Sequence, residues 1–291
     1  MITEMKHNYD KEELSCLHEC LYTILGEIVR VCEKNDIQYF IIGGSAIGAF
    51  FEHSILPWDD DIDIGMTREN YNRFLSIAPT ELKSGFFLQW PESEQHTPFY
   101  FAKVRMDNTS FVEGIFSKLD IHHGIYVDIF PFDKAPDNTL LQKGQRTLAN
   151  FIKGCFMGKD IWQWKYFGKC DVSQPRPRSA FACLITRVMC LLFSKRTLYR
   201  MLCRIQTLYN KRNTKYYNLI PMPRDHIRVE CIRNARLVPF GPLIVTAPDD
   251  LETYLRHHYP NLRRHIPEEE KVNHRPETLS FEKQYKAIDH S

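Results

Sequence analysis

The chain has 291 residues, of which 43% are hydrophobic and 25% are charged, so it can bury the core of one large domain or two small ones. It contains no apolar run of 18 residues, which argues against a membrane span; its longest apolar stretch, residues 181–193, includes Arg187. The charged opening MITEMKHNYDKEELS lacks the apolar segment of a secretory signal, so we expect a cytoplasmic location.

The cysteines and the charge distribution further limit the classes of protein to which the chain can belong. Nine cysteines are scattered without a CxxC pair, and Cys16 and Cys20, which flank His18, have no second pair to complete a zinc site. We therefore expect reduced cysteines. The net charge of +2 conceals an asymmetry, because residues 141–240 hold 20 Lys and Arg against four acids. That segment is expected to face something anionic.

The first predicted element is an amphipathic helix over residues 10–35. Asp10 is placed to cap it, and acidic residues follow in the first turn. Its apolar residues recur at helical spacing and predict packing against a sheet: Leu14, Leu17, Leu21, Ile24, Leu25, Ile28 and Val31.

A strand at 38–42 then leads through a glycine turn into a helix at 45–51. The turn holds Gly43, Gly44 and Ser45. Glycines permit close backbone approach, and a helix N-terminus offers free N–H groups to an anion. Gly-Gly turns are common, so this pattern alone is weak evidence for a phosphate site. An Asp-x-Asp strand after it makes the evidence strong.

Four carboxylates lie within five residues in the stretch PWDDDIDIG, residues 57–65. Buried carboxylates this close together are costly unless they bind a cation, and oxygen ligands suit a hard divalent ion. The alternation over residues 61–64 predicts a strand on which Asp61 and Asp63 share one face, about 6.6 Å apart. Asp59 is a further candidate ligand, and Asp60 is expected to point away.

Two other interpretations of this stretch compete with a cation site. A solvated acidic turn is one of them. A calcium-binding EF-hand loop is the other, but that loop needs glycine and glutamate where this chain has Ile64 and Asn70. The calcium interpretation therefore fails.

The next elements are a helix from Thr67, stopped near Pro79, and a strand at 86–89. Residues 100–106 and 110–113 are expected to form a hairpin that turns at 107–109. Lys103 and Arg105 share one face of the first strand, which suits either solvent or a phosphate group. A strand at 125–130 carries Asp128, which can complete a carboxylate triad with Asp61 and Asp63.

The second half of the chain predicts mainly helices, at about 136–156, 180–193 and 196–212. The stretch 158–178 is expected to be a loop or short helix over the site. Short strands follow over 227–247, then a helix over 248–258 and a polar, poorly ordered tail from His274. The basic residues of 180–212 suit either solvated helix faces or an anchor on an anionic membrane.

The strings GGSAIGAF, LPWDDDIDIGMTRENY, FAKVRMDNTSF and GIYVDIFPFD, within residues 20–135, resemble the LicD family of phosphorylcholine and related phosphotransferases. The resemblance implies an α+β nucleotidyltransferase-like fold, a mixed sheet flanked by helices, with a helical basic insertion and a C-terminal α/β segment. We expect a catalytic core over residues 1–140. Residues 141–291 are then a basic region near substrate or membrane whose C-terminal segment packs on the core.

The resemblance also implies which residues take part in catalysis and binding, and which substrates they act on. Asp61, Asp63 and Asp128 would be catalytic residues and ligands of Mg²⁺ or Mn²⁺. The phosphate-binding residues would be Gly43, Gly44, Ser45, Lys103 and Arg105. The donor would be a CDP-linked alcohol such as CDP-choline, and the acceptor a sugar hydroxyl of a surface glycan, which could be lipid-linked.

One position departs from the family pattern. The family carries an Arg-His pair shortly before its acidic string, and Phe51 stands where that arginine is expected. The change removes a positive charge beside the donor site and leaves the donor open. His53 and Lys103 are candidate substitutes.

Two other functions are compatible with these residues. One is a nucleotidyltransferase that moves NMP from an NTP to a small molecule or protein. The other is a basic membrane- or nucleic-acid-binding module with an inactive site. The intact acidic triad argues against the second, and no nucleic-acid-binding motif supports it.

Overall fold

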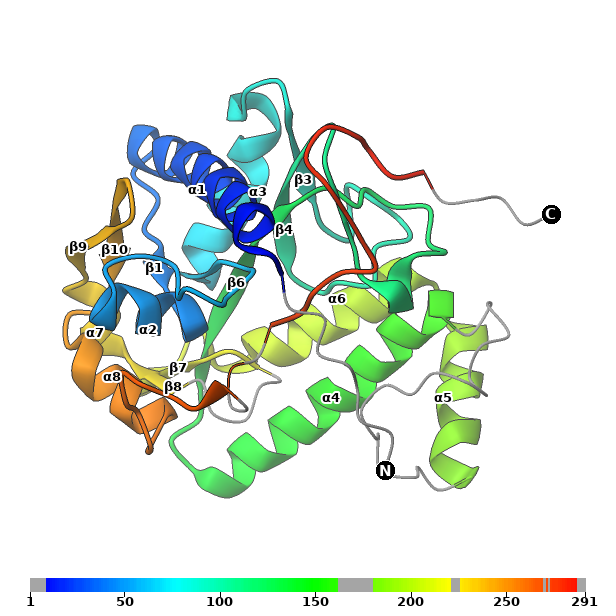
Figure 1. The fold of residues 1–291 in the computed structure, drawn as a ribbon. Helices are drawn as coiled ribbons and strands as arrows, with labels where there is room; N and C mark the ends of the chain where they lie inside the picture. Colours follow the sequence, from blue (N-terminus) through cyan, green and yellow to red (C-terminus); the bar gives the residue numbers. More distant parts are fainter. Residues whose placement is uncertain (1–8, 162–179, 221–225, 269–270, 272, 287–291) are drawn as a thin grey trace.

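The computed structural model describes residues 9–161, 180–220, 226–268, 271 and 273–286, and its fold is α+β, as expected (Figure 1). The chain begins with helix α1, Lys11–Lys34. The side chain of Asp10 accepts a hydrogen bond from the Glu13 N–H, and the Glu13 carboxylate accepts one in return from the Asp10 N–H. This reciprocal cap explains why the predicted start of the helix is correct to within one residue.

Within the described residues the main sheet has seven strands, five of which follow the order β1-β2-β6-β4-β3. Strands β2 and β6 are parallel, and the other pairs along this path are antiparallel. The five strands span Phe40–Ile41, Asp63–Thr67, Tyr126–Ala135, Ala102–Met106 and Phe86–Gln89. At the far end of β6, β7 (Tyr216–Asn218) pairs with it and β8 (His226–Arg228) extends the sheet. The sheet is therefore mixed, as expected.

Two short helices join the first strands of the sheet. Helix α2, Gly43–Phe51, follows β1, and helix α3, Arg68–Glu81, follows β2. The Thr67 side chain caps α3 by accepting a hydrogen bond from the Asn70 N–H. Pro79 lies inside α3, so the helix continues past the proline that was expected to stop it.

The second half of the chain is helical first and mixed later. Helices α4 (Thr139–Ile161), α5 (Ala180–Leu192) and α6 (Lys195–Gln206) lie together at the lower right of Figure 1. Then come α7 (Val229–Arg233), the hairpin of β9 (Arg236–Phe240) and β10 (Leu243–Ala247), and α8 (Leu251–His258). Buried residues of these last elements, such as Phe240, Val245 and Leu255, belong to the same core as α1 and the main sheet.

The predicted hairpin of residues 100–106 and 110–113 is wrong. Both edges of β4 are occupied, by β3 and by β6, so β4 is a central strand. Strand β5, Ser110–Val112, pairs instead with β11, Thr278–Ser280. The turn at 107–109 is present, with Asn108 at φ +59°, but a local turn signal cannot tell which strand the chain will meet.

The prediction of a poorly ordered tail from His274 is also wrong for residues 273–286. Strand β11 pairs with β5 in register, Leu279 opposite Phe111, and Leu279 and Phe281 pack against the main core. In Figure 1 this red segment runs beside the start of α1. Of the loop or short helix expected over 158–178, residues 158–161 continue helix α4, and residues 162–178 lie outside the described residues.

A prediction follows for two glycines. A Cβ at Gly65 in β2 would lie 2.6 Å from a ring carbon of Phe40 and 2.7 Å from one of Phe132, both in the core. Gly65→Ala should therefore lower the free energy of unfolding by about 1–3 kcal/mol. At Gly144 in α4 a Cβ would meet nothing within 4 Å, so Gly144→Ala should raise it by about 0.5–1 kcal/mol. Urea denaturation of both variants measures the difference, and equal stabilities would contradict this packing.

Candidate active site

Strand β2 begins at Asp63, two residues later than predicted, so Asp61 lies in the loop before the strand. Ile62 and Ile64 are completely buried, as expected of the apolar positions in this stretch. Asp61 remains close enough to Asp63 and Asp59 to raise the pKa of both carboxyls. The acidic string thus divides into a loop, residues 59–61, and the first residue of a central strand.

A row of polar residues crosses the sheet at this level. Asp63 of β2 lies opposite Asp128 of β6, Asp128 lies opposite Lys103 of β4, and Lys103 lies opposite Gln89 of β3. Neighbouring strands are about 4.8 Å apart, and paired residues project from the same face. The Lys103 Nζ is 2.7 Å from Asp128 Oδ1. The sheet therefore aligns two predicted acids and the predicted lysine.

The carboxylates of this site have raised pKa values, because they are buried and lie near one another. Burial is the main cause for each, and nearby acids add to it for Asp59, Asp61 and Asp63. The pKa of Asp59 rises to about 8. That of Asp128 rises to about 6, since burial outweighs the opposing effect of Lys103. The cluster has too little positive charge of its own.

The glycine turn lies directly against these acids. Gly43 has φ +58°, and a Cβ there would be 3.1 Å from Asp63 Oδ2. A Cβ at Gly44 would be 2.5 Å from Asp59 Oδ2, so a larger residue would displace the carboxylate. The Ser45 hydroxyl accepts a hydrogen bond of 2.9 Å from the Asp63 N–H. The turn thereby positions the acids; its role in holding phosphate stays a prediction.

Lys103 and Arg105 share one face of β4, as the period of two predicts. Lys103 Nζ lies 3.4 Å from the centre of the Tyr126 ring, and the Arg105 guanidinium lies 4.8 Å from it. Arg105 donates hydrogen bonds of 2.6 Å to Gln89 Oε1 and to the Gly124 carbonyl. Both side chains are buried, and these bonds show that Arg105 braces the interior.

The candidate metal ligands group differently from the predicted triad. Among the residues that the structure describes, the trio with one oxygen each within 4.8 Å of the others is Asp59, Asp60 and Asp61. Asp63 and Asp128 adjoin this trio on the sheet. The all-carboxylate donor set and its raised pKa values fit a hard divalent cation.

Sequence reasoning missed several residues beside the acids. Glu113, just after β5, is near enough to raise the pKa of Asp61 and Asp128. Asp60 is buried rather than solvated, and it accepts hydrogen bonds from Tyr9 and from the N–H of His274. An acid ending a predicted strand was the available signal for Glu113, whereas no local pattern marks contacts made across more than 200 residues.

The position that departs from the family pattern lies at the end of α2. The ring of Phe51 packs on Phe50 at 4.8 Å between centres. His53 is exposed, with φ +53°, and its carbonyl accepts a hydrogen bond from the Gly241 N–H. Lys103, in contrast, contacts Asp128 of the predicted triad directly. The role of either residue in donor binding stays a prediction.

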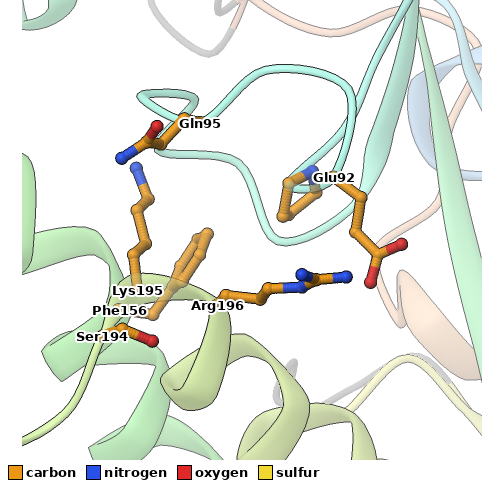
Figure 2. A pocket seen from close by; sticks show the side chains of 7 residues that line it. Glu92, Gln95, Phe156, Ser194, Lys195 and Arg196 are labelled. Carbon is orange, nitrogen blue, oxygen red and sulfur yellow. The ribbon is translucent and has the colours of Figure 1, made fainter.

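A pocket of about 420 Å³ lies away from these residues, between the loop after β3 and the start of α6 (Figure 2). Figure 2 shows Lys195 extending toward Gln95 and Arg196 extending toward Glu92. Lys195 is buried and paired with Asp160, and burial lowers its pKa to about 7. It is therefore not one of the solvated basic residues expected on this helix. No predicted site residue lines the pocket.

In the part of the chain that the structure describes, no helix has the length and apolar character needed to cross a membrane.

Comparison with known proteins shows that the stretch holding the acidic site is similar to one family. Residues 36–170 match the family described as LicD/FKTN/FKRP, nucleotidyltransferase domain. The lipopolysaccharide cholinephosphotransferase LicD of Haemophilus influenzae is 29% identical over 148 residues, which cover 48% of this chain and 52% of that protein.

Two uncharacterised Rickettsia proteins match shorter stretches. The one from Rickettsia typhi is 35% identical over 66 residues, 23% of this chain and 21% of that protein. The one from Rickettsia prowazekii is 31% identical over 70 residues, 24% of this chain and 26% of that protein. The chain thus spans about half the length of the cholinephosphotransferase, about a fifth of the Rickettsia typhi protein and about a quarter of the Rickettsia prowazekii protein. The resemblance seen in the acidic and glycine motifs is confirmed as a similarity: residues 36–170 match the nucleotidyltransferase domain of the LicD/FKTN/FKRP family.

Proposed function

We propose that the chain is a divalent-cation-dependent phosphotransferase that moves a phospho-alcohol group, such as phosphorylcholine, from a CDP-linked donor to a sugar hydroxyl of a cell-surface glycan. The row of Asp63, Asp128 and Lys103 across three strands, with Asp61 beside it, carries the proposal. The match to a lipopolysaccharide cholinephosphotransferase supports the choice of group and acceptor.

Each residue of the row has a task in this proposal. Asp61 and Asp63 hold Mg²⁺ or Mn²⁺, and such an ion, when bound, offsets the charge of the donor diphosphate. The N–H groups at the start of α2, where no side chain caps the helix, face the same diphosphate. Asp128 accepts the proton of the acceptor hydroxyl, and Lys103 holds that carboxylate in place. CMP is the leaving group.

The expected cytoplasmic location, and contact of the region 180–212 with an anionic membrane, belong to the same proposal. A lipid-linked glycan acceptor would make such contact useful. The proposed reaction needs neither nucleic acid nor a further cofactor.

A donor panel tests the reaction type. Purified protein is incubated with Mg²⁺, a glycan acceptor and one of CDP-choline, CDP-ribitol, CDP-glycerol or CTP. The mass of the product is then determined by mass spectrometry. Addition of a phospho-alcohol and release of CMP are expected. Addition of a nucleotide and release of pyrophosphate would instead support the nucleotidyltransferase alternative, which the description of the matched domain keeps in view.

Neutral substitutions of the two acids should abolish transfer without unfolding the chain. Asp61→Asn and Asp63→Asn keep the side-chain shape but remove the charge that holds the cation, so the rate should fall at least about 100-fold. Asp249→Asn, at an exposed acid before α8, is the matched control and should retain full activity. Steady-state rates and melting curves measure both effects, and full activity in either acid variant would refute the assignment.

The raised pKa values predict how stability depends on pH and metal. A carboxyl whose pKa rises from 3.8 to about 8 on folding, as for Asp59, binds more protons in the folded state across that window. Raising the pH from 4 toward 8 should therefore destabilise the metal-free protein. Mg²⁺ at 100 times its Kd should add about 2.7 kcal/mol, and its effect on Tm should be larger at pH 8 than at pH 5.5.

Asp63→Asn makes this stability prediction specific. It removes one repelling carboxylate, so in EDTA at pH 8 its Tm should exceed that of the wild type, while its gain from Mg²⁺ should shrink. Scanning calorimetry with EDTA and with Mg²⁺ measures all four states. An equal Mg²⁺ shift in wild type and variant would contradict the cation site.

A further inference from the structure

The C-terminal segment 273–285 crosses the molecule beside the acidic loop; we call it the C-terminal strap. At one end β11 pairs with β5, and the Glu277 N–H donates to the Val112 carbonyl at 2.9 Å. Beyond β11 the Tyr285 hydroxyl donates to the Ser117 carbonyl at 3.3 Å. The strap is thus fixed to the strand that ends beside Glu113, one of the acids near the site.

The other end of the strap is fixed to the start of α1. Arg275 forms an ion pair of 3.0 Å with Glu13 and places its guanidinium 5.1 Å from the centre of the Tyr9 ring. Glu13 is also the residue that completes the cap of α1. The strap, the cap and Tyr9 therefore form one connected unit, although residues 9 and 275 are far apart in the chain.

Two groups of this unit donate hydrogen bonds to the same oxygen of Asp60. The Tyr9 hydroxyl and the His274 N–H each donate a hydrogen bond of 2.8 Å to Asp60 Oδ2. The other oxygen, Oδ1, is buried and has no hydrogen-bond partner among the described residues. Asp60 is only 2% exposed, so water does not satisfy this oxygen from bulk solvent.

A buried carboxylate oxygen without a donor is costly, and a cation is a partner that would relieve that cost. One oxygen of Asp60 lies within 4.8 Å of oxygens from Asp59 and Asp61. Asp59 is itself held through its carbonyl, which lies 2.8 Å from His18 Nε2. The loop is therefore braced from outside, which is the arrangement by which surrounding residues tune a metal site.

We propose that Asp60 is an additional ligand of the divalent cation, with Asp59 and Asp61, and that Tyr9 and the backbone of His274 are its positioning residues. The C-terminal strap then helps to position a metal ligand, so it belongs to the site. The inference rests on the proposed function, because it assigns a further ligand to the same acidic site.

Direct cation binding tests the inference without an activity assay. Mn²⁺ binding is measured by electron paramagnetic resonance and calorimetry on the full chain, for Asp60→Asn and Tyr9→Phe, two substitutions of nearly unchanged shape. Asp60→Asn should lose one bound Mn²⁺ or raise its Kd at least about 10-fold. Tyr9→Phe, which removes one donor to the ligand, should raise the Kd by about 10-fold.

Two controls match these variants. Tyr285→Phe removes a hydroxyl from the same strap without touching Asp60, and Asp249→Asn removes an exposed acid elsewhere; both should bind Mn²⁺ as the wild type does. Unchanged stoichiometry and Kd in Asp60→Asn would overturn the inference. An unchanged Kd for Mn²⁺ in Tyr9→Phe would overturn the positioning role of Tyr9.

Asp61→Asn and Asp63→Asn separate this inference from the proposed function. If these two lose Mn²⁺ while Asp60→Asn retains it, the strap assignment fails and the cation-dependent function stands. If none of the three changes Mn²⁺ binding, the cation site of the proposed function fails as well.

Discussion

The repulsion among carboxylates at one level of the sheet is the constraint on which the structure of the site depends. Burial raises the pKa values of Asp59, Asp61, Asp63 and Asp128, and repulsion from neighbouring acids raises them further. Lys103 forms an ion pair with Asp128, and burial lowers the pKa of the lysine. One lysine cannot balance four acids. An arrangement that destabilises the metal-free fold is understandable where a divalent cation and a diphosphate complete the charge balance.

The elements around the acids hold them in place from several directions. The parallel register of β2 and β6 puts Asp63 opposite Asp128, and the glycines at the start of α2 leave room for the Asp59 and Asp63 carboxylates. Tyr9 and the C-terminal strap brace Asp60 from the far end of the chain. Binding groups held on rigid elements suit phosphoryl transfer, in which positioning and charge stabilisation supply most of the catalysis.

Local patterns predicted what depends on neighbouring residues. The apolar spacing and the Asp10 cap located α1, and the alternation of residues 61–64 identified Ile62 and Ile64 as core. The motifs in residues 40–65 and 124–133 pointed to the family whose description residues 36–170 match. What failed was non-local: β5 pairs with β11 across more than 160 residues, and His274 meets Asp60 across 214. A three-residue strand has no periodicity to detect, and its partner is chosen by the folded core rather than by the nearest turn.

The central claim is that the acidic loop and the row on the sheet form a cation-dependent site for a nucleotide-linked donor. The most direct measurement is anomalous scattering from crystals grown with Mn²⁺ and CDP-choline. The account predicts an anomalous peak about 2.0–2.3 Å from oxygens of Asp61 and Asp63, with the donor diphosphate on its other side. A diphosphate bound elsewhere, or no peak at these carboxylates at saturating Mn²⁺, would contradict it.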